Sequence, residues 1–506
     1  MFQYFFIPLL LVFVWFAAFS YLKWNFKYWS KRKVFGPEPK ILQGTFPKTY
    51  DGQCNLVEEL HEIYKKFKDA HSYVGVFQAR SPKLFILDPD VAMQILKTKF
   101  TYFHDNESSQ WSSLNVEQLR FSSPFVSVGD VWKEKRAELS QALTINKIRS
   151  HFNMMQATAC KMTEYINIHN YGTVWNAKDL ANRFTCDVMT KFIWGIEENT
   201  FHDREGRSQI HQMADIMLNQ AIRCVHYYGR TAAWPYLRKL WPVRFFPGLS
   251  DRFFQQLAST TMRDCTLVNR PSESIVINHL MQLKEKKKLN DLQIAGHTTT
   301  VLIDGFETAA LVMAHCLLML ARHQRVQSKL RNILESKTVN ISSFDELMAL
   351  PYLDQCIQET LRLFPPLATL FKICTEYMSV DDCRNGSEVM LVPGDVVYIS
   401  AYSFHRDAAY YEKPDEYWPE RFDEELGGIQ KYRNMGVFLP FGDGPRMCPG
   451  IKLGMMEVKI GITEMIRQFV VEPAANTRID NKVAADSFLL RLDGEINLRI
   501  KGIAEK

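Results

Sequence analysis

The chain has 506 residues, of which 46% are hydrophobic and 13% aromatic. This apolar content can fill a large core and excludes a disordered chain. The formal net charge of +5 comes without the dense basic clusters of a nucleic-acid-binding protein, so we expect a globular protein with no nucleic-acid partner.

The first 22 residues carry no charged side chain. As a helix of about 33 Å they would cross a hydrocarbon core of about 30 Å. The basic residues that follow at once are Lys23, Lys27, Lys31, Arg32 and Lys33. A cleaved signal peptide is the alternative, and the Ala17-Ala18 pair is its only support. By the positive-inside rule, residues 1–22 are predicted as a transmembrane anchor, with the rest of the chain in the cytosol.

A stiff segment follows the anchor. Residues 23–40 are basic and include Gly36-Pro37-Glu38-Pro39, which is typical of a hinge. An amphipathic helix is predicted near 55–67, and two alternating strands are predicted near 73–78 and 82–88. We therefore expect a small sheet near the front of the chain.

Helical patterns dominate from Trp132 to about Leu334. Further on, a helix from about 353 to 363 ends before two prolines, and residues 390–398 have the pattern of a β-hairpin around a proline-glycine turn. The fold class predicted from these patterns is mainly α with small β-sheets (α+β), with one domain over residues 41–506.

The stretch 301–321 is nearly continuous apolar sequence and could be mistaken for a second membrane span. Asp304, Glu307 and His315 lie within it. An acid at mid-membrane costs on the order of 2.5 to 3.5 kcal/mol, so a long helix through a protein core fits better.

Cys448 is the one cysteine of the ten with a distinctive context, because the ten lack the spacing of zinc or redox sites. Residues 441–450 read Phe-Gly-Asp-Gly-Pro-Arg-Met-Cys-Pro-Gly, directly before a helical pattern. Glycines let the backbone fold tightly around the sulfur, and a helix N-terminus favours negative charge. Both effects stabilise a thiolate. The alternative is an ordinary glycine-rich turn with a buried cysteine.

Five positions match the pattern F-x-x-G-x-R-x-C-x-G: Phe441, Gly444, Arg446, Cys448 and Gly450. With this motif the chain resembles the cytochrome P-450 family of haem-thiolate monooxygenases, over essentially its whole length. The resemblance implies a cytochrome P-450 fold after one N-terminal transmembrane helix, and haem b whose iron is ligated by Cys448. Arg446 would pair with a haem propionate, and Phe441 would shield the ligand from water.

Two further motifs support the resemblance. Glu359 and Arg362, together with Arg421 of a Pro-Glu-Arg-Phe segment, resemble the family's buried structural triad. Trp132 and Arg136 match the W-x-x-x-R motif of a helix whose Trp and Arg reach the haem propionates in the family.

The segment Asp304-Gly305-Phe306-Glu307-Thr308 resembles the family's oxygen-binding segment. The resemblance implies that Thr308 and Glu307 deliver the protons that cleavage of the O–O bond requires. The alternatives are a Thr308 hydroxyl bonded back to its own helix and a structural ion pair for Glu307.

Asp304 departs from the family pattern, which has a small residue at this position. It lies four residues before Thr308, so both share one helical face. Asp304 could turn outward to a partner, could polarise distal water and substrate, or could form an ester with a haem methyl, as a Glu does in some relatives. We favour the polar role.

Electrons must come from outside, because the chain contains no flavin or nicotinamide fingerprint. The resemblance to animal microsomal members, with an insect-like Gly-Phe-Glu-Thr run, implies an NADPH-cytochrome reductase as donor, with cytochrome b5 as a second candidate. It also implies O2, membrane lipid and lipophilic small molecules as partners, at the cytosolic side of the endoplasmic reticulum membrane. The basic residues expected to steer the reductase are Lys133, Lys135, Lys431, Arg433 and Lys452.

By resemblance, we expect a largely apolar pocket. It would be lined by the helix predicted over 301–321 and by the segments 106–128, 211–224, 367–374 and 487–490. Hydroxylation or epoxidation of a lipophilic compound is the predicted reaction. Haem-thiolate enzymes that rearrange peroxides, and a non-enzymatic haem carrier or sensor, are the rivals. The Glu307-Thr308 pair favours oxygenation over both.

Overall fold

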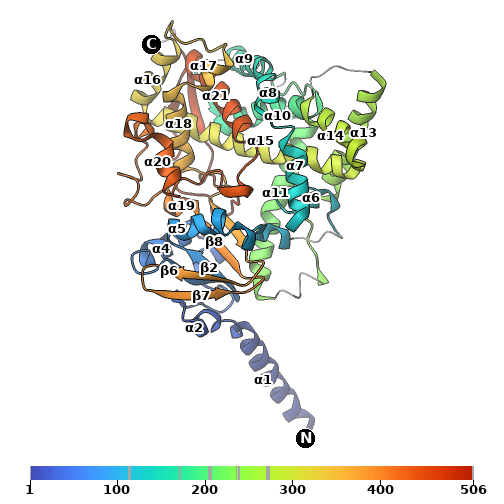
Figure 1. Cartoon of the computed structure of the whole chain (residues 1–506), viewed down its shortest axis with the longest axis vertical. Helices are drawn as coiled ribbons and strands as arrows, with labels where there is room; N and C mark the ends of the chain where they lie inside the picture. The colour runs from blue at the N-terminus through green and yellow to red at the C-terminus, as the bar shows by residue number, and fades with distance from the viewer. Residues whose placement is uncertain are drawn as a thin grey trace.

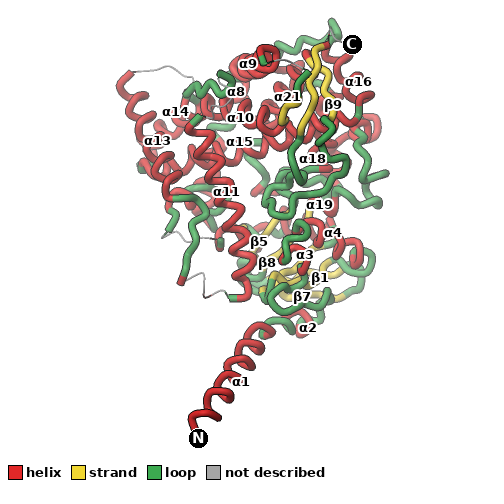
Figure 2. The backbone as a smooth tube through the Cα atoms, turned by 180° about the vertical axis from the view of Figure 1, so that it is seen from behind, coloured by secondary structure: helices red, strands yellow, loops and turns green. Residues whose placement is uncertain are grey.

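The computed structural model describes residues 2–111, 116–169, 172–202, 208–234, 236, 240–268 and 274–503. A sheet-rich part lies next to the N-terminal helix, and a larger helical part lies beyond it (Figure 1). Figure 2 shows the same division from behind. The mainly α architecture with small sheets confirms the predicted fold class.

The α-helices of the described residues are α1 (Phe2–Lys23), α2 (Tyr28–Lys31), α3 (Pro47–Tyr50), α4 (Leu56–Phe67), α5 (Pro89–Met93), α6 (Gln118–Phe121), α7 (Gly129–Ser140), α8 (Ile145–Arg149), α9 (Phe152–Ile168), α10 (Ala177–Trp194), α11 (Gln209–Arg230), α13 (Gly248–Val268), α14 (Ile275–Lys287), α15 (Asp291–Arg322), α16 (Gln324–Leu334), α17 (Phe344–Met348), α18 (Pro351–Leu363), α19 (Ala401–Phe404), α20 (Gly428–Asn434) and α21 (Ile451–Gln468).

The strands of the described residues are β1 (Tyr73–Gln78), β2 (Ser81–Ile86), β3 (Asp105–Asn106), β4 (Val174–Asn176), β5 (Thr369–Ile373), β6 (Met378–Asp382), β7 (Ser387–Leu391), β8 (Val396–Ser400), β9 (Phe469–Pro473) and β10 (Asn497–Gly502). They form one sheet in the order β1-β2-β8-β5-β3, a second in the order β4-β10-β9, and the pair β6-β7. In the first sheet β2 and β8 are parallel, with Leu84 opposite Val397, and the other neighbours are antiparallel.

The predicted β-hairpin over 390–398 is wrong. Strands do flank the turn, but β7 pairs with β6, whereas β8 pairs with β2 and β5. The burial patterns explain the difference. All five residues of β8 are buried, which suits the middle of a sheet, while alternate residues of β7 are exposed.

The N-terminal helix α1 projects from the body (Figures 1 and 2). Its described side chains are largely exposed and apolar. At its base Tyr21 stacks on Trp234, with ring centroids 5.2 Å apart, and the Arg80 guanidinium donates to the Tyr21 carbonyl at 2.9 Å. In the following segment Trp29 is buried and its indole N–H donates to the Val76 carbonyl at 3.3 Å. The base of α1 is therefore fixed to the sheet-rich part.

Helix α15 runs through the helical part and packs against α10, α13 and α21. It starts ten residues before the stretch predicted from its apolar run, at a capping box formed by Asn290 and Gln293. By length and hydropathy it is the one described helix that could cross a membrane, but 72% of its apolar window is buried inside the protein. The prediction of a core helix is therefore confirmed.

Candidate active site

The Cys448 loop folds back on itself directly before α21. The Cys448 N–H donates to the Phe441 carbonyl at 3.0 Å, and the Met447 N–H donates to the Gly444 carbonyl at 3.0 Å. The Gly450 N–H is directed at the sulfur and lowers the pKa of the thiol. These contacts hold one sulfur at the start of a long helix, as the sequence predicts.

Gly444 occupies a position that no other residue fits. Its φ is +70°, and a Cβ there would lie 1.9 Å from the Leu96 carbonyl oxygen. Leu96 belongs to a π-helical turn, Gln94–Thr98, and the adjacent Lys97 forms an ion pair with Asp443 at 2.7 Å. The turn is thus pressed against the Cys448 loop.

The surroundings of Cys448 do not make it a free thiolate. Burial raises the pKa of the thiol to about 11, and the Asp304 carboxylate raises it further, while the Gly450 N–H and Arg136 lower it. A bound cation such as iron would offset the burial and stabilise the thiolate. No group of three His, Cys, Asp or Glu that could hold a metal occurs among the described residues.

Buried cations lie beside the loop. Burial lowers the pKa of Arg446 to about 9 and that of Lys372 on β5 to about 7. The positive charge of Arg446 also lowers the pKa of Lys372. Asp105 is the acid that acts on both, at 3.5 Å from Arg446. Cations with depressed pKa values gain from added carboxylates, so this region fits the propionates of haem. Sequence reasoning missed Lys372, although a lone lysine in an apolar strand is a usable signal.

Arg446 also anchors the loop to the segment before α7. Its guanidinium donates to the carbonyls of His104 at 2.6 Å, Pro124 at 2.9 Å and Ser127 at 2.8 Å. It also lies 4.4 Å from the centroid of the Trp132 ring. The Arg446 guanidinium therefore donates mainly to backbone carbonyl groups, which the sequence did not predict.

Trp132 and Arg136 lie one turn apart on α7 and both contact this region. Trp132 is buried, and Arg136 donates to the Met447 carbonyl at 2.6 Å. Phe441 is partly buried against the core. The structure thus brings together all the predicted cofactor-binding residues around Cys448, including Gly450, whose Cβ position is 3.9 Å from the sulfur.

Thr308 and Glu307 of α15 have the partners that the two alternatives to proton delivery predict, a bond within the helix and an ion pair. The Thr308 hydroxyl donates to the Asp304 carbonyl in its own helix, and Glu307 forms an ion pair with Lys178 of α10 at 2.6 Å. Gly305 faces α10, where a Cβ would lie 2.5 Å from Met189. Thr308 and Asp304 therefore share a face that is distinct from the α10 contact.

Asp304 does not turn outward to a partner, because its carboxylate has no hydrogen bond or ion pair within the described residues. Asp304 has accessible surface, yet burial raises the pKa of its carboxyl to about 7. Both observations hold if the carboxyl faces an enclosed space. The Asp304 carboxylate also raises the pKa of the Cys448 thiol, so the two groups lie close enough to interact electrostatically.

The predicted triad is confirmed. Arg362 lies 2.8 Å from Glu359, and Arg421 lies 3.0 Å from the same carboxylate, with all three side chains buried. Arg362 also donates to the carbonyls of His405 and Pro414, so the triad ties α18 to the segment that leads to the Cys448 loop.

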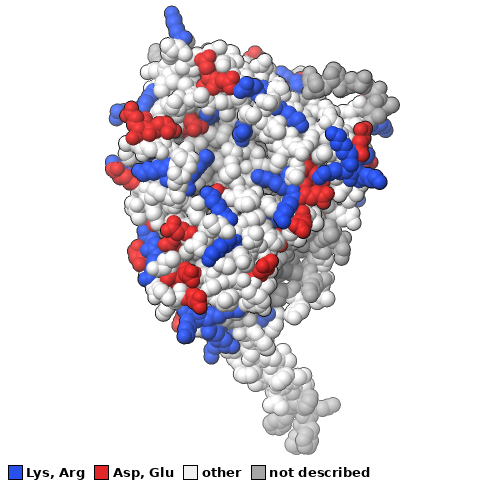
Figure 3. Space-filling view, in the orientation of Figure 1, with Lys and Arg blue, Asp and Glu red and all other residues white. Residues whose placement is uncertain are grey.

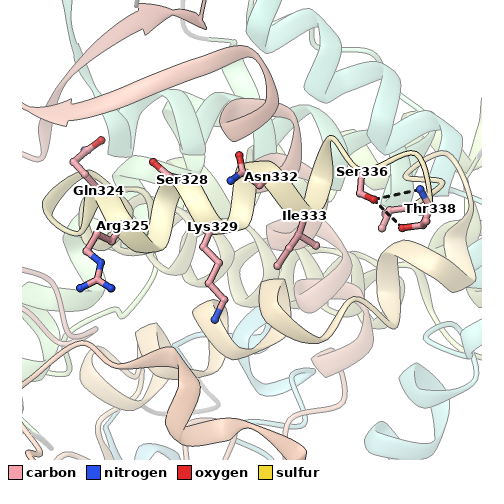
Figure 4. A pocket seen from close by; sticks show the side chains of 9 residues that line it. Gln324, Arg325, Ser328, Lys329, Asn332, Ile333, Ser336 and Thr338 are labelled. Carbon is pink, nitrogen blue, oxygen red and sulfur yellow. Dashed lines mark hydrogen bonds between the residues drawn. The ribbon is translucent and has the colours of Figure 1, made fainter.

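A cavity of about 350 Å³ lies between α11 and the first sheet. Its lining includes Glu107, Trp111, Val225, Tyr228, Phe371 and Phe488. Three of the segments predicted for the pocket contribute. Helix α11 contributes Val225, Tyr228, Gly229 and Arg230 and not residues 211–224, and the predicted helix over 301–321, which is part of α15, contributes no lining residue, so that part of the prediction is wrong for this cavity. A larger, open hollow on α16 (Figure 4) is lined by residues 324–339 and contains none of the predicted site residues.

A family model described as cytochrome P450 matches residues 36–496 of the chain. The chain is a member of the cytochrome P450 family. It is 35% identical to the probable cytochrome P450 28d1 of Drosophila melanogaster, over 94% of this chain and 95% of that protein. It is 30% identical to the probable cytochrome P450 6a13 of the same fly, over 95% and 96%. Cytochrome P450 6l1 of Blattella germanica is 24% identical over 95% and 94%.

These relatives confirm the insect-type cytochrome P450 that the motifs indicated, and the protein is a cytochrome P450 monooxygenase. Membership of the family implies a haem cofactor whose iron is held by a cysteine thiolate.

Proposed function

We propose that this cytochrome P450 binds haem b through Cys448 and oxidises lipophilic small molecules, by hydroxylation or epoxidation, with electrons from an NADPH-cytochrome reductase. One observation carries the proposal: Cys448 is held in a tightly folded loop at the start of α21, with Arg136, Arg446 and Trp132 gathered beside it. Cytochrome b5 is a second electron donor in this proposal.

The residues that would hold haem are those gathered around Cys448. The sulfur ligates the iron, and Phe441 limits the access of water to it. Arg446, Lys372 and Arg136 supply positive charge for the propionates, with Trp132 packed beside Arg446. Bound haem supplies an iron that activates dioxygen, with electron density donated by the thiolate.

Proton delivery is the proposed task of Thr308 and Glu307. The Thr308 hydroxyl can turn from the Asp304 carbonyl toward the enclosed space, because a hydroxyl rotates freely about its C–O bond. The Glu307 side chain is 17% exposed, and its carboxylate pairs with Lys178. Glu307 would therefore connect the protein interior next to α15 with the exterior. These two residues form a route for protons from solvent.

The proposed location is the cytosolic side of the endoplasmic reticulum membrane. Helix α1 supports it, because its exposed apolar side chains suit a hydrocarbon core, and the basic residues after it suit the cytosolic surface. Exposed aromatic side chains near its base, Trp24 and Tyr236, suit the interface between lipid and water.

The reductase would dock on basic residues near α7 and α20. Lys133, Lys431 and Lys452 are exposed, whereas Lys135 is buried against Glu138 and is removed from the predicted docking residues. Lys135 lies on the inner face of α7, which its sequence neighbours did not reveal. Basic and acidic side chains are interspersed on the face drawn in Figure 3, so docking would depend on local basic groups.

The proposal is tested with the haem-loaded full chain, reductase, NADPH and isotopically labelled dioxygen. Product that carries one labelled oxygen atom and forms only with reductase and NADPH is expected. Conversion of a lipid peroxide without reductase, and no labelled product from any lipophilic compound, would instead support the peroxide-rearranging alternative.

A further inference from the structure

The cavity between α11 and the first sheet has a wall of aromatic rings around Trp111. The centroid of the indole lies 5.9 Å from that of Tyr228, 6.1 Å from that of Phe371 and 5.5 Å from that of Phe488, and these residues also line the cavity. The ring of Phe245 stacks on the indole at 6.2 Å. These neighbours hold the indole of Trp111 in one orientation.

Two buried polar groups in the cavity wall have no hydrogen-bond partner among the described residues. They are the indole nitrogen of Trp111 and the hydroxyl of Thr369 on β5, a residue that is only 4% exposed. Thr369 and Phe371 are two residues apart in β5, so their side chains project from the same face of the strand. Because the Phe371 ring contacts Trp111, the Thr369 hydroxyl lies on the side of the sheet that faces Trp111. A buried group without a partner costs free energy, and a ligand that bonds to it removes the cost.

The charged side chains of the cavity do not call for an ionic ligand. Among the described lining residues these are Glu107, Arg230 and Asp486. Glu107 is buried, but it forms an ion pair with the buried Lys83 and accepts a hydrogen bond from the Tyr228 hydroxyl at 3.4 Å. Arg230 and Asp486 are exposed to solvent. A neutral ligand therefore suits the interior of the cavity better than an ion.

The two groups without partners specify what a neutral ligand must carry. An indole N–H only donates, whereas a hydroxyl donates or accepts, so the ligand needs a hydrogen-bond acceptor. A carbonyl oxygen has two lone pairs and can accept from both groups. The aromatic wall favours a ligand with aromatic rings, and a volume of about 350 Å³ favours a small one.

We infer that this cavity selects small, neutral aromatic compounds with a carbonyl oxygen, which accepts hydrogen bonds from Trp111 Nε1 and the Thr369 hydroxyl. The inference deepens the proposed function and rests on it, because it treats the bound compound as one that the enzyme oxidises. The described lining includes no residue of α15, so Trp111 and Thr369 determine which compounds bind and not the oxidation itself.

The test compares benzophenone with 1,1-diphenylethene on the haem-loaded full chain. The two compounds have nearly the same shape, but the second has a methylene group in place of the carbonyl oxygen. Affinity is measured by equilibrium dialysis, which does not depend on turnover. We expect benzophenone to bind at least about tenfold more tightly, because it alone pairs with the two buried groups.

Two variants remove one group each and keep the packing. Trp111→Phe retains an aromatic ring, and Thr369→Val retains the shape of the side chain. Trp111→Phe should lower the affinity for benzophenone about tenfold and Thr369→Val several-fold, and both should leave the affinity for 1,1-diphenylethene within about twofold of the wild type. Equal affinity of the wild-type protein for the two compounds, or the full preference for benzophenone in either variant, would overturn the inference.

Trp194→Phe is the matched control. The indole nitrogen of Trp194 is also buried without a partner among the described residues, but it belongs to α10, and Trp194 does not line the cavity. This variant should retain the full preference for benzophenone.

Benzophenone also reports where it binds, because under ultraviolet light it forms a bond to a C–H group beside it. Mass spectrometry of the irradiated wild-type complex should find the label on peptides from the cavity wall, in the segments 225–230, 367–371 or 485–490. A label confined to other peptides would overturn the inference.

A spectrum separates this inference from the proposed function. A wild-type protein without the red-shifted Soret band of a reduced, carbon-monoxide-bound haem-thiolate would overturn the proposed function itself. A normal band together with equal affinity for the two compounds would overturn only the roles of Trp111 and Thr369.

Discussion

At the scale of single residues, several side chains have partners that lie far away in sequence. Glu307 pairs with Lys178, and Arg446 bonds to carbonyls of residues 104–127. The sequence motifs identified Arg446 and Glu307, but spacing along one segment cannot reveal a partner on another. Lys372 was missed as well: a lone lysine in an apolar strand marks it as unusual, but its burial and its position near Arg446 depend on the sheet around it.

Thr308→Ala should lower the yield of oxygenated product per NADPH roughly 100-fold, because a positioned proton donor contributes on that order. Thr298→Ala is the control: its hydroxyl also bonds back to α15, at 3.1 Å to the Ile294 carbonyl, but from a buried position ten residues away. Product and NADPH are measured in the same reaction. An unchanged ratio in Thr308→Ala would remove this residue from proton delivery.

We expect the stability of the protein to depend on pH through the buried Asp187 of α10. Burial raises the pKa of its carboxyl to about 6 from the ordinary 3.8, although the Thr200 N–H donates to it. The folded protein thus holds this proton more tightly than the unfolded chain. The group's contribution to the free energy of unfolding is therefore fully present well below pH 4 and declines by about 3 kcal/mol in all as the pH rises through about 6.

Asp187→Asn should lack this decline, because the amide does not titrate. Denaturant unfolding of both proteins at pH values from about 4 to 7 measures it. Parallel curves for the two proteins would show that Asp187 does not titrate in this range.

At the scale of elements, most of the local patterns fold as predicted. The strand β1 has the predicted bounds, α15 is a core helix, and α18 ends before the two prolines. The hairpin over 390–398 failed because strand pairing is decided by burial in the whole sheet and not by the turn. The start of α15 was also missed, since its polar first turns depend on capping rather than on apolar periodicity.

Gly444→Ala tests how the π-helical turn fixes the Cys448 loop. The substitution combines a positive φ with a contact to the Leu96 carbonyl, so we expect loss of haem incorporation, measured as haem bound per folded chain. Gly386→Ala is the matched control, with a φ of +72° but open space around the Cβ position. It should cost only about 1 to 2 kcal/mol of stability and retain haem. Equal haem content in both variants would rule out a special role for the contact.

At the scale of the whole molecule, the helical part carries the site, while the sheet-rich part lies beside the projecting helix α1 (Figure 1). The cavity between α11 and the first sheet lies at the junction of the two parts. A ligand that partitions from a membrane would thus meet an apolar cavity on its way to the site. The basic residues proposed for reductase docking, on α7 and α20, lie away from α1 (Figure 1).

Reversal of charge on the proposed docking face should weaken the reductase interaction. The double variant Lys133→Glu with Lys431→Glu should raise the KM for reductase several-fold at low salt, and the difference should shrink at high salt because surface charges are screened. The control is Lys65→Glu with Lys66→Glu on α4, whose side chains are also exposed. An equal effect of the two pairs would mean that net charge, and not the docking face, controls the encounter.

The central claim is that Cys448 ligates haem iron as a thiolate, and the spectrum of the reduced, carbon-monoxide-bound full chain tests it most directly. We expect a strongly red-shifted Soret band, which is typical of thiolate ligation, and its loss in Cys448→Ala. A Soret band at the shorter wavelength of histidine or neutral thiol ligation in the wild-type protein, or a red-shifted band that survives in Cys448→Ala, would contradict the claim.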